Sequence, residues 1–380
     1  MVGGGPGAFI GAVHRMAAAL DGQFELVAGA FSSDPEASRE TGSELGLDPS
    51  RVYGSYQEMA EAEAALPEDV RVEAVSIVTP NHLHHPVARV FLEAGIHVIC
   101  DKPLTTTLAH AEELCREAAD RDLVFCVTHN YSGYPMVKEA RERVRAGELG
   151  QIRKVVVEYS QGWLSTLLEA DGHKQASWRA DPGQAGGSSA LGDIGTHAFH
   201  IAHYVTGLQA EGLLADLGTL VVGRRLEDDA VVLLRYEGGA RGVLMASQVC
   251  LGERNHLRLR VYGSEGGLDW CQETPDRLRL TCADGSERIL HDGGEGLSER
   301  ATVHQRLPAG HPEGFIEAFA SLYRNVARTL AARTGQADVE PFHDDFPTVR
   351  DGARGVHFIE AALRSNREGT WVPMGYTPPS

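Results

Sequence analysis

Short apolar runs alternate with amphipathic stretches along the first third of the chain. The apolar runs predict strands at Phe24–Ala30, Ala74–Val78, His97–Cys100 and Leu123–Val127. The amphipathic stretches predict helices at Pro35–Leu45, Pro86–Ala94 and Thr107–Arg121. Strands that alternate with helices predict a parallel, doubly wound α/β sheet with helices on both faces.

Beyond about His129 this rhythm changes. After a helix expected at Pro135–Ala146, short strands follow one another with turn residues between them, which favours a second, largely antiparallel sheet. Those strands are expected at Ile152–Tyr159, Leu213–Leu220, Ala230–Tyr236, Gly242–Gln248, Leu257–Tyr262 and Arg277–Thr281. Two late helices, Glu313–Ala332 and Thr348–Ser365, precede an irregular tail.

The length of 380 residues predicts two domains, because a single hydrophobic core usually stops growing below that size. We expect a first domain at 1–128, a second at 129–345, and a C-terminal helix and tail at 346–380.

Charge and cysteine usage narrow the class of protein. A net charge of -18 without a block of Lys or Arg argues against nucleic acid and anionic membranes as partners. The six cysteines form no Cys-x-x-Cys pair, which favours reduced thiols in a cytoplasmic protein. We find no stretch long enough to span a bilayer and no secretory signal at the start.

The chain opens on a glycine-rich segment, Gly3-Gly4-Gly5-Pro6-Gly7-Ala8, that fits Gly-x-Gly-x-x-Ala. Such glycines let the backbone approach a pyrophosphate at the start of the next helix, here expected from Phe9 to Leu20. The alternative is a merely flexible N-terminus. Only Met1 and Val2 precede Gly3, so the central strand of a dinucleotide-binding sheet is expected to be truncated, through a misplaced start or an incomplete sheet.

The turn after the second expected strand bears on the choice of cofactor. A carboxylate there usually binds the adenosine ribose, but this turn holds Ser32 and Ser33, with Asp34 following. Serines accept a hydroxyl or a phosphate, and Asp34 has an equal claim to be the cap of the helix that begins at Pro35. We expect NAD, and NADP stays open.

Two segments carry the groups needed to oxidise an alcohol. Asp101-Lys102-Pro103 closes an apolar strand, and Gly187–His197 contains both Asp193 and His197. An ammonium polarises a hydroxyl oxygen and a neutral imidazole takes its proton, so these residues are expected to line one pocket. The alternatives are a solvated lysine, a core histidine, or an exchange of roles with the nearby His200 and His203.

Taken together, these motifs resemble the glucose-fructose oxidoreductase/inositol dehydrogenase (Gfo/Idh/MocA) family along essentially the whole chain. Thr79–His84 is similar to the family's loop against the cofactor, and Asp101-Lys102-Pro103 to its Glu-Lys-Pro motif, with Asp for Glu. Gly187–His197 is similar to its second signature, with serines at 188 and 189 in place of glycines. Segments 129–135, 161–163 and 178–179 are similar to a subgroup thought to oxidise sugars or cyclic polyols.

The resemblance implies that 1–128 is a dinucleotide-binding Rossmann domain and that 129–345 is a substrate and oligomerisation domain with an open-faced, largely antiparallel sheet. It also implies a set of site residues. The implied cofactor contacts are Gly3, Gly5, Pro6, Gly7, Ala8, Phe9, Ser32, Ser33, Thr79, Pro80, Asn81, His84, Asp101, Lys102, Asn130, Trp178 and Arg179. The implied substrate contacts are Lys102, Tyr131, Trp163, Asp193 and His197. The tryptophans could equally belong to the core, and His82, His84 and His85 lack the partners that a zinc site needs, so no metal is expected.

The expected reaction transfers a hydride from a secondary alcohol of a sugar or cyclic polyol to the cofactor. His197 would remove the hydroxyl proton, Lys102 would stabilise the oxygen, and Asp193 would orient substrate or histidine. A glycosidase-like enzyme that oxidises, eliminates and reduces again, and a non-catalytic dinucleotide or sugar sensor, are the two alternatives. The resemblance also implies a homodimer or homotetramer, because the family's open sheet face is usually covered by another subunit.

Overall fold

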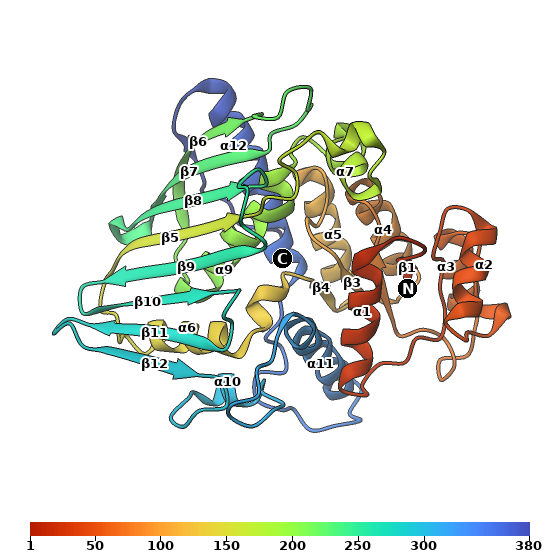
Figure 1. Ribbon diagram of the computed structural model, residues 1–380. Helices are drawn as coiled ribbons and strands as arrows, with labels where there is room; N and C mark the ends of the chain where they lie inside the picture. The colour runs from red at the N-terminus through yellow and green to blue at the C-terminus, as the bar shows by residue number, and fades with distance from the viewer. The chain divides into compact units, whose positions relative to one another are not determined.

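The computed structural model describes residues 1–380, which form two compact units (Figure 1). The first unit comprises 1–128, 319–353 and 378–380, and the second comprises 129–318 and 354–377. The chain therefore returns to the first unit after completing most of the second.

The first unit is built on a four-stranded parallel sheet in the order β1-β2-β3-β4, which confirms the expected α/β class. The strands are β1 (Val2–Gly3), β2 (Ala74–Val78), β3 (His97–Cys100) and β4 (Phe125–Val127). Its helices are α1 (Phe9–Leu20), α2 (Pro35–Glu44), α3 (Tyr56–Ala64), α4 (His84–Glu93), α5 (Leu108–Asp120) and, from residue 319, α11 (Phe315–Arg333). The strands are almost entirely buried, as expected of a sheet covered on both faces.

The strand expected at Phe24–Ala30 is reduced to two isolated bridges, which join Val2 to Ala30 and Gly29 to Val52. The reason lies in its neighbour, because β1 has two residues and can pair with only a short stretch of a partner. Two backbone hydrogen bonds place this segment beside β1: Gly3 N–H donates to Ala30 O at 2.9 Å, and Ala30 N–H donates to Met1 O at 3.0 Å.

The sequence patterns missed helix α3, whose C-terminal part carries a fully buried carboxylate. Glu63 accepts hydrogen bonds from the Arg51 guanidinium, the Tyr53 hydroxyl (2.8 Å) and the Val72 N–H (3.1 Å). Burial alone would raise the pKa of Glu63, but these donors outweigh it and hold the pKa below its usual value. The buried pair ties α3 to the segments on either side of it.

The second unit contains a nine-stranded sheet in the order β12-β11-β10-β9-β5-β8-β7-β6-β13. β5 and β8 are parallel and all other neighbours are antiparallel, so the expected, largely antiparallel sheet is confirmed. The strands are β5 (Ile152–Ser160), β6 (Ala210–Gly218), β7 (Asp229–Tyr236), β8 (Arg241–Ser247), β9 (His256–Gly263), β10 (Gly266–Cys271), β11 (Arg277–Cys282), β12 (Glu287–His291) and β13 (Val372–Pro373). Three strands were not predicted. β10 begins with two glycines, β12 contains charged residues, and β13 contains a proline, and each of these features obscures a strand pattern.

Helices pack on one face of this sheet only (Figure 1). They are α6 (Pro135–Arg145), α9 (Thr196–Thr206) and the part of α12 (Val349–Glu368) after residue 353, while α7 (Lys174–Arg179), α8 (Pro182–Ala185) and α10 (Glu299–Thr302) are short. On β7, Ala230, Val232 and Leu234 are buried beneath the helices, whereas Val231 and Leu233 point outward and are 38% and 39% exposed.

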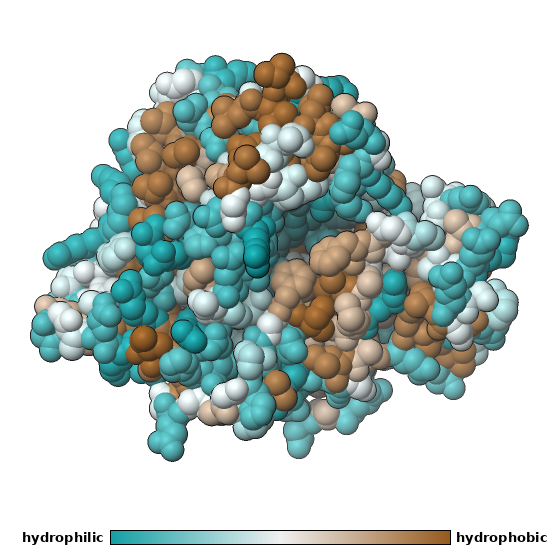
Figure 2. Space-filling view, viewed as in Figure 1, coloured by the Kyte–Doolittle hydropathy of each residue, from teal (hydrophilic) through white to brown (hydrophobic).

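Apolar side chains also gather in the upper part of Figure 2, the region of the β6–β7 connection in Figure 1. Leu220 and Val222 of that connection are 62% and 93% exposed. The second unit therefore offers apolar surface on the outer sheet face and at this connection.

We predict that Glu63→Gln destabilises the protein by about 3 kcal/mol, because it leaves Arg51 beside a neutral amide in a buried site. The free energy of unfolding in urea measures the loss, with the exposed Glu61→Gln on the same helix as the matched control. Since the pKa of Glu63 is lowered in the folded state, the difference between wild type and variant should persist above the unfolded pKa of glutamate. It should vanish as the pH falls through the lower folded pKa. Equal stabilities at neutral pH would contradict this assignment.

Candidate active site

The glycine loop between β1 and α1 is packed too tightly for side chains. Gly3 and Gly4 have φ of +84° and +79°, and a Cβ on Gly5 would lie 2.6 Å from Phe31 O. A Cβ on Gly11, in the first turn of α1, would lie 2.4 Å from the Cα of Gly4. Gly11 was missed by the sequence analysis, although its spacing from the glycine run could have pointed to it. The loop thus brings its backbone against the start of α1 as a pyrophosphate cradle requires.

The remaining residues of this loop lie where the sequence predicted. Ala8 is the N-cap of α1 and supplies no side-chain cap, so the helix begins on backbone alone. Pro6 and Gly7 are exposed and Phe9 is 67% exposed. These features fit a dinucleotide, whose phosphates need free approach to the helix start.

In the next turn, Asp34 is the N-cap of α2 and accepts a hydrogen bond from Glu36 N–H at 2.9 Å. Ser32 Oγ accepts from Asp34 N–H at 3.1 Å, and Ser33 is exposed. Asp34 therefore caps helix α2, in agreement with the capping alternative.

The loops after β2 and β3 are joined by His84. Its Nε2 lies 2.9 Å from Thr79 O and its Nδ1 lies 2.8 Å from Pro103 O. Carbonyl oxygens only accept, so a neutral imidazole donates to one of the two and a doubly protonated imidazole donates to both. Burial lowers the pKa of His84, whereas the nearby Asp101 and the two carbonyls act in the opposite direction. His84 is thus a buried brace between two loops that were expected to contact the cofactor.

Lys102 follows β3 at the carboxyl edge of the sheet, where open α/β sheets bind ligands. Asp101 Oδ1 accepts hydrogen bonds from Lys102 N–H at 2.9 Å and from the Thr128 hydroxyl at 3.0 Å. The shorter acid at position 101 therefore fixes the backbone of Lys102. Pro80 and Asn81 lie in the loop after β2, and Asn81 is buried.

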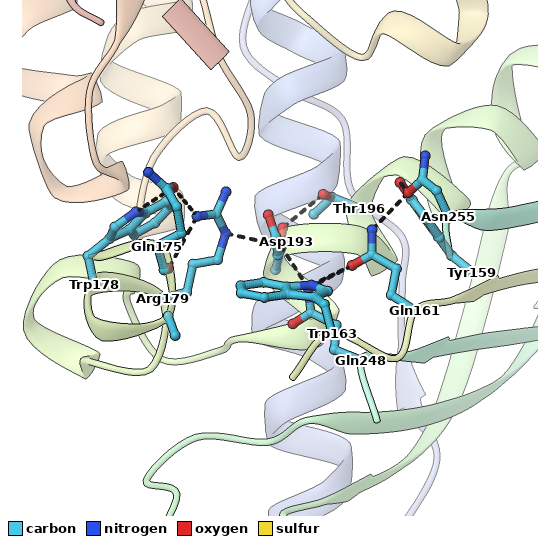
Figure 3. Close-up of polar contacts among 12 residues, drawn as sticks. Tyr159, Gln161, Trp163, Gln175, Trp178, Arg179, Asp193, Thr196, Gln248 and Asn255 are labelled. Atoms are coloured by element: carbon cyan, nitrogen blue, oxygen red, sulfur yellow. Dashed lines mark hydrogen bonds and ion pairs between the residues drawn. The ribbon is translucent and has the colours of Figure 1, made fainter. Parts of the chain in front are cut away.

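In the second unit, Asp193 lies in a π-helical turn, Leu191–Gly195, directly before α9. Such turns are rare and occur frequently at functional sites. Asp193 Oδ2 accepts from Arg179 Nε at 3.2 Å and from Gln248 Nε2 at 2.9 Å (Figure 3). The carboxylate is therefore held by one cation and one amide from two different segments.

A chain of amides continues from Asp193 (Figure 3). Gln161 Oε1 accepts from Gln248 Nε2 at 3.1 Å and from the Trp163 indole at 2.9 Å. Gln161 Nε2 donates to Asn255 Oδ1 at 2.8 Å, which also accepts from the Tyr159 hydroxyl at 2.7 Å. Gln161, Gln248 and Asn255 escaped the sequence analysis, because single amides on separate strands form no motif.

Tyr131 closes this network on the other side. Its hydroxyl lies 2.5 Å from that of Tyr159 and accepts from Asn255 Nδ2 at 3.2 Å. Burial raises the pKa of both phenols, so both stay protonated at neutral pH. The edge of the His197 ring packs against Tyr131, with 4.7 Å between ring centroids.

The neighbouring histidines differ in their surroundings. His200 stacks on His129 at 4.4 Å, and His203 Nδ1 lies 3.1 Å from Leu208 O just beyond the end of its own helix. Only His197 among the three on α9 contacts the Tyr131 side of the network.

Arg179, Trp178 and Gln175 of α7 form a second cluster (Figure 3). The Arg179 guanidinium lies 4.1 Å above the Trp178 ring, and Gln175 Oε1 accepts from both side chains at 2.7 and 3.2 Å. Asn130, also expected to contact the cofactor, is buried, and its Nδ2 has no hydrogen-bond partner. An unsatisfied buried donor of this kind is common where a ligand completes a site.

The Glu227 carboxylate binds the segment at the beginning of the π-helical turn. It accepts from Ser188 Oγ at 2.6 Å, Ser189 N–H at 2.8 Å and Leu191 N–H at 3.1 Å. Burial raises its pKa. The serines that replace glycines in this signature thus bind a buried carboxylate, a role that the sequence pattern did not reveal.

Each unit therefore assembles its own group of predicted residues. The first holds the glycine loop, Ser32, Ser33, the Thr79–His84 segment, Asp101 and Lys102, and the second holds Asn130, Tyr131, Trp163, Trp178, Arg179, Asp193 and His197.

No helix in the chain combines the length and apolar character needed to cross a membrane.

Comparison with known proteins extends these observations. Residues 1–140 match the oxidoreductase family with an NAD-binding Rossmann fold, and residues 137–269 match the GFO/IDH/MocA C-terminal domain. YfiI, an uncharacterized oxidoreductase of Bacillus subtilis, is 34% identical over 98% of this chain and 95% of its own. Levoglucosan dehydrogenase of Pseudarthrobacter phenanthrenivorans is 30% identical over 78% of this chain and 82% of its own.

A solved structure is similar along nearly the whole chain. It is an inositol dehydrogenase homolog from Azotobacter vinelandii in complex with NADH and myo-inositol, 37% identical, with a TM-score of 0.91 over 98% of this chain and 96% of that one.

We predict that His84→Ala weakens NADH binding about tenfold, or roughly 1.4 kcal/mol, because it unlinks the loops after β2 and β3. Fluorescence titration with NADH measures the change. The matched control is His82→Ala, an exposed residue of the same loop that should bind as wild type does. Unchanged affinity in His84→Ala would show that the brace is dispensable.

Proposed function

Because this chain belongs to the Gfo/Idh/MocA family of NAD-binding oxidoreductases, we propose that it oxidises a secondary alcohol of a sugar or cyclic polyol. The observation that carries the proposal is the polar wall around Asp193. One carboxylate, three amides and a guanidinium are joined by hydrogen bonds, with an indole among them. Adjacent hydroxyls of a ring need such alternating donors and acceptors, and an aromatic face suits the C–H surface of a sugar.

NAD, once bound, accepts the hydride from the substrate carbon. On this chain, the glycine loop and the uncapped start of α1 would hold the pyrophosphate, and the Ser32–Ser33 turn would face the adenosine ribose. We propose NAD as the preferred cofactor, because no basic side chain lies in that turn to receive a 2′-phosphate, and the net charge of -18 disfavours one.

We assign three catalytic roles. His197 removes the hydroxyl proton, Lys102 stabilises the negative charge that develops on the oxygen, and Asp193 orients the substrate. Hydrogen bonds from Arg179 and Gln248 fix the position of the Asp193 carboxylate, which suits a group that accepts substrate hydroxyls.

Two similar proteins support this substrate class, because their names refer to levoglucosan and to myo-inositol. Both ligands are rings rich in hydroxyls, in keeping with the polar wall. We further propose a homodimer or homotetramer, because exposed Val231 and Leu233 leave apolar area on the outer sheet face. None of the six cysteines forms a disulfide, and we propose a cytoplasmic location.

We predict that His197→Ala lowers kcat/KM for the best polyol about 10²- to 10⁴-fold while NADH binding is kept. Wild-type activity should rise with pH through the imidazole range, because the proton acceptor must be neutral. His203→Ala, on the same helix, is the matched control and should keep most activity. A flat pH profile together with a fully active His197→Ala would refute the assigned role.

We predict that Lys102→Met abolishes formation of reduced cofactor without abolishing NADH binding, because the ammonium acts on the reacting oxygen. Stopped assays with inositols and pyranose sugars measure the loss. A glycosidase-like enzyme would instead release a cleaved sugar with no net NADH. A sensor would bind its ligand equally well with lysine or methionine and turn nothing over, which would contradict the proposal.

A further inference from the structure

Four side chains of metal-binding types converge near the beginning of β9 and the end of β10. The centre is His256, whose Nδ1 lies 3.4 Å from Glu273 Oε2, 3.7 Å from Glu253 Oε2 and 3.9 Å from Cys271 Sγ. The ligand atoms of Glu253, His256 and Glu273 all lie within 4.8 Å of one another. None of these residues belongs to the network around Asp193.

We propose that Glu253, His256, Cys271 and Glu273 bind a Zn²⁺ ion. Zinc bonds of about 2.0–2.3 Å to N, O and S in a tetrahedron place neighbouring ligand atoms roughly 3.3–3.8 Å apart. The distances from His256 Nδ1 to Glu253 and Glu273 match these edges. Cys271 Sγ lies near His256 Nδ1 but outside the group of mutually close ligand atoms, so the Cys271 side chain has to turn toward the carboxylates for an ion to enter. Mixed sulfur, nitrogen and oxygen ligands suit zinc rather than Mg²⁺ or Ca²⁺, which take mostly oxygen.

Ordinary ion pairing explains this cluster less well. One imidazole faces two carboxylates through the same nitrogen, and a thiol also lies against that nitrogen. Arg258 is held by both oxygens of Asp269 at 2.9 and 2.7 Å and is not free to neutralise the glutamates. A divalent cation bound between the two glutamates would add positive charge there and stabilise the thiolate.

An ion here has access from solvent and a connection to the candidate active site. A cavity of about 490 Å³, lined by Gly252, Arg254, Gln272 and Glu273, borders the cluster. Glu273 Oε1 lies 3.3 Å from the N–H of Asn255, the residue whose side chain binds Tyr159 and Gln161. Fixing Glu273 and His256 on either side would therefore hold Asn255 in place.

No metal site was predicted from the sequence, because these four residues do not have the short spacings of zinc motifs. Here His256 and Glu253 are three residues apart, but Cys271 and Glu273 come from the next strand and turn. Antiparallel pairing brings Cys271 opposite Arg258, two residues from His256.

The test uses the full chain, stripped of metal with a chelator and titrated with Co²⁺ as a spectroscopic probe, then with Zn²⁺ as competitor. We expect one Co²⁺ per chain with a thiolate-to-cobalt charge-transfer band, which Zn²⁺ abolishes by displacement. Cys271→Ser should remove the band, and His256→Ala and Glu273→Gln should weaken binding at least about tenfold. Cys282→Ser, another half-buried cysteine of the same sheet, is the matched control and should behave as wild type.

A band that persists in Cys271→Ser would overturn the proposal, as would equal Co²⁺ affinity in wild type and in His256→Ala. The melting temperature supplies a second measurement that does not depend on colour. Zn²⁺ should raise it for wild type in a concentration-dependent way and not for His256→Ala. Because these measurements are of binding alone, their outcome is independent of whether the protein oxidises a polyol.

Discussion

The hydrogen-bonded carboxylate of Asp193 is the constraint on which the second unit's site depends. Its partners, Arg179 and Gln248, come from α7 and from the segment after β8, so one side chain fixes two segments far apart in the sequence. Hydrogen bonds of Gln161 and Asn255 connect this network to the hydroxyls of Tyr159 and Tyr131. A wall held in this way presents its donors and acceptors in fixed positions, which lowers the cost of orienting a hydroxylated ring.

In the first unit, hydrogen bonds likewise fix the positions of candidate site residues. Asp101 fixes the backbone of Lys102, and His84 bridges the carbonyls of Thr79 and Pro103. The glycine loop is rigid for a different reason, since Gly4 and Gly11 approach too closely for any side chain. In both units, hydrogen-bonded side chains or close-packed glycines determine where the surface groups lie, so the chemistry proposed at Lys102 and His197 depends on the residues that order these surfaces.

Those parts of the fold that are determined by a local sequence pattern could be predicted from the sequence. The apolar runs at β2 and β3 were located to the residue, because buried parallel strands are short and uninterrupted. The strand expected at Phe24–Ala30 was wrong in extent, because its length depends on β1, not on its own residues. Gln161, Gln248, Asn255 and Glu227 could not be predicted, since each matters only through partners that the fold brings together.

The central claim is that a hydride leaves a ring carbon for NAD on this chain. The most direct measurement incubates the protein with NAD⁺ and a panel of inositols and pyranose sugars deuterated at their secondary carbons, followed by mass spectrometry of the cofactor. The account predicts reduced cofactor that carries one deuterium with at least one polyol. Reduced cofactor without deuterium, or a modified sugar with no reduced cofactor at all, would contradict it.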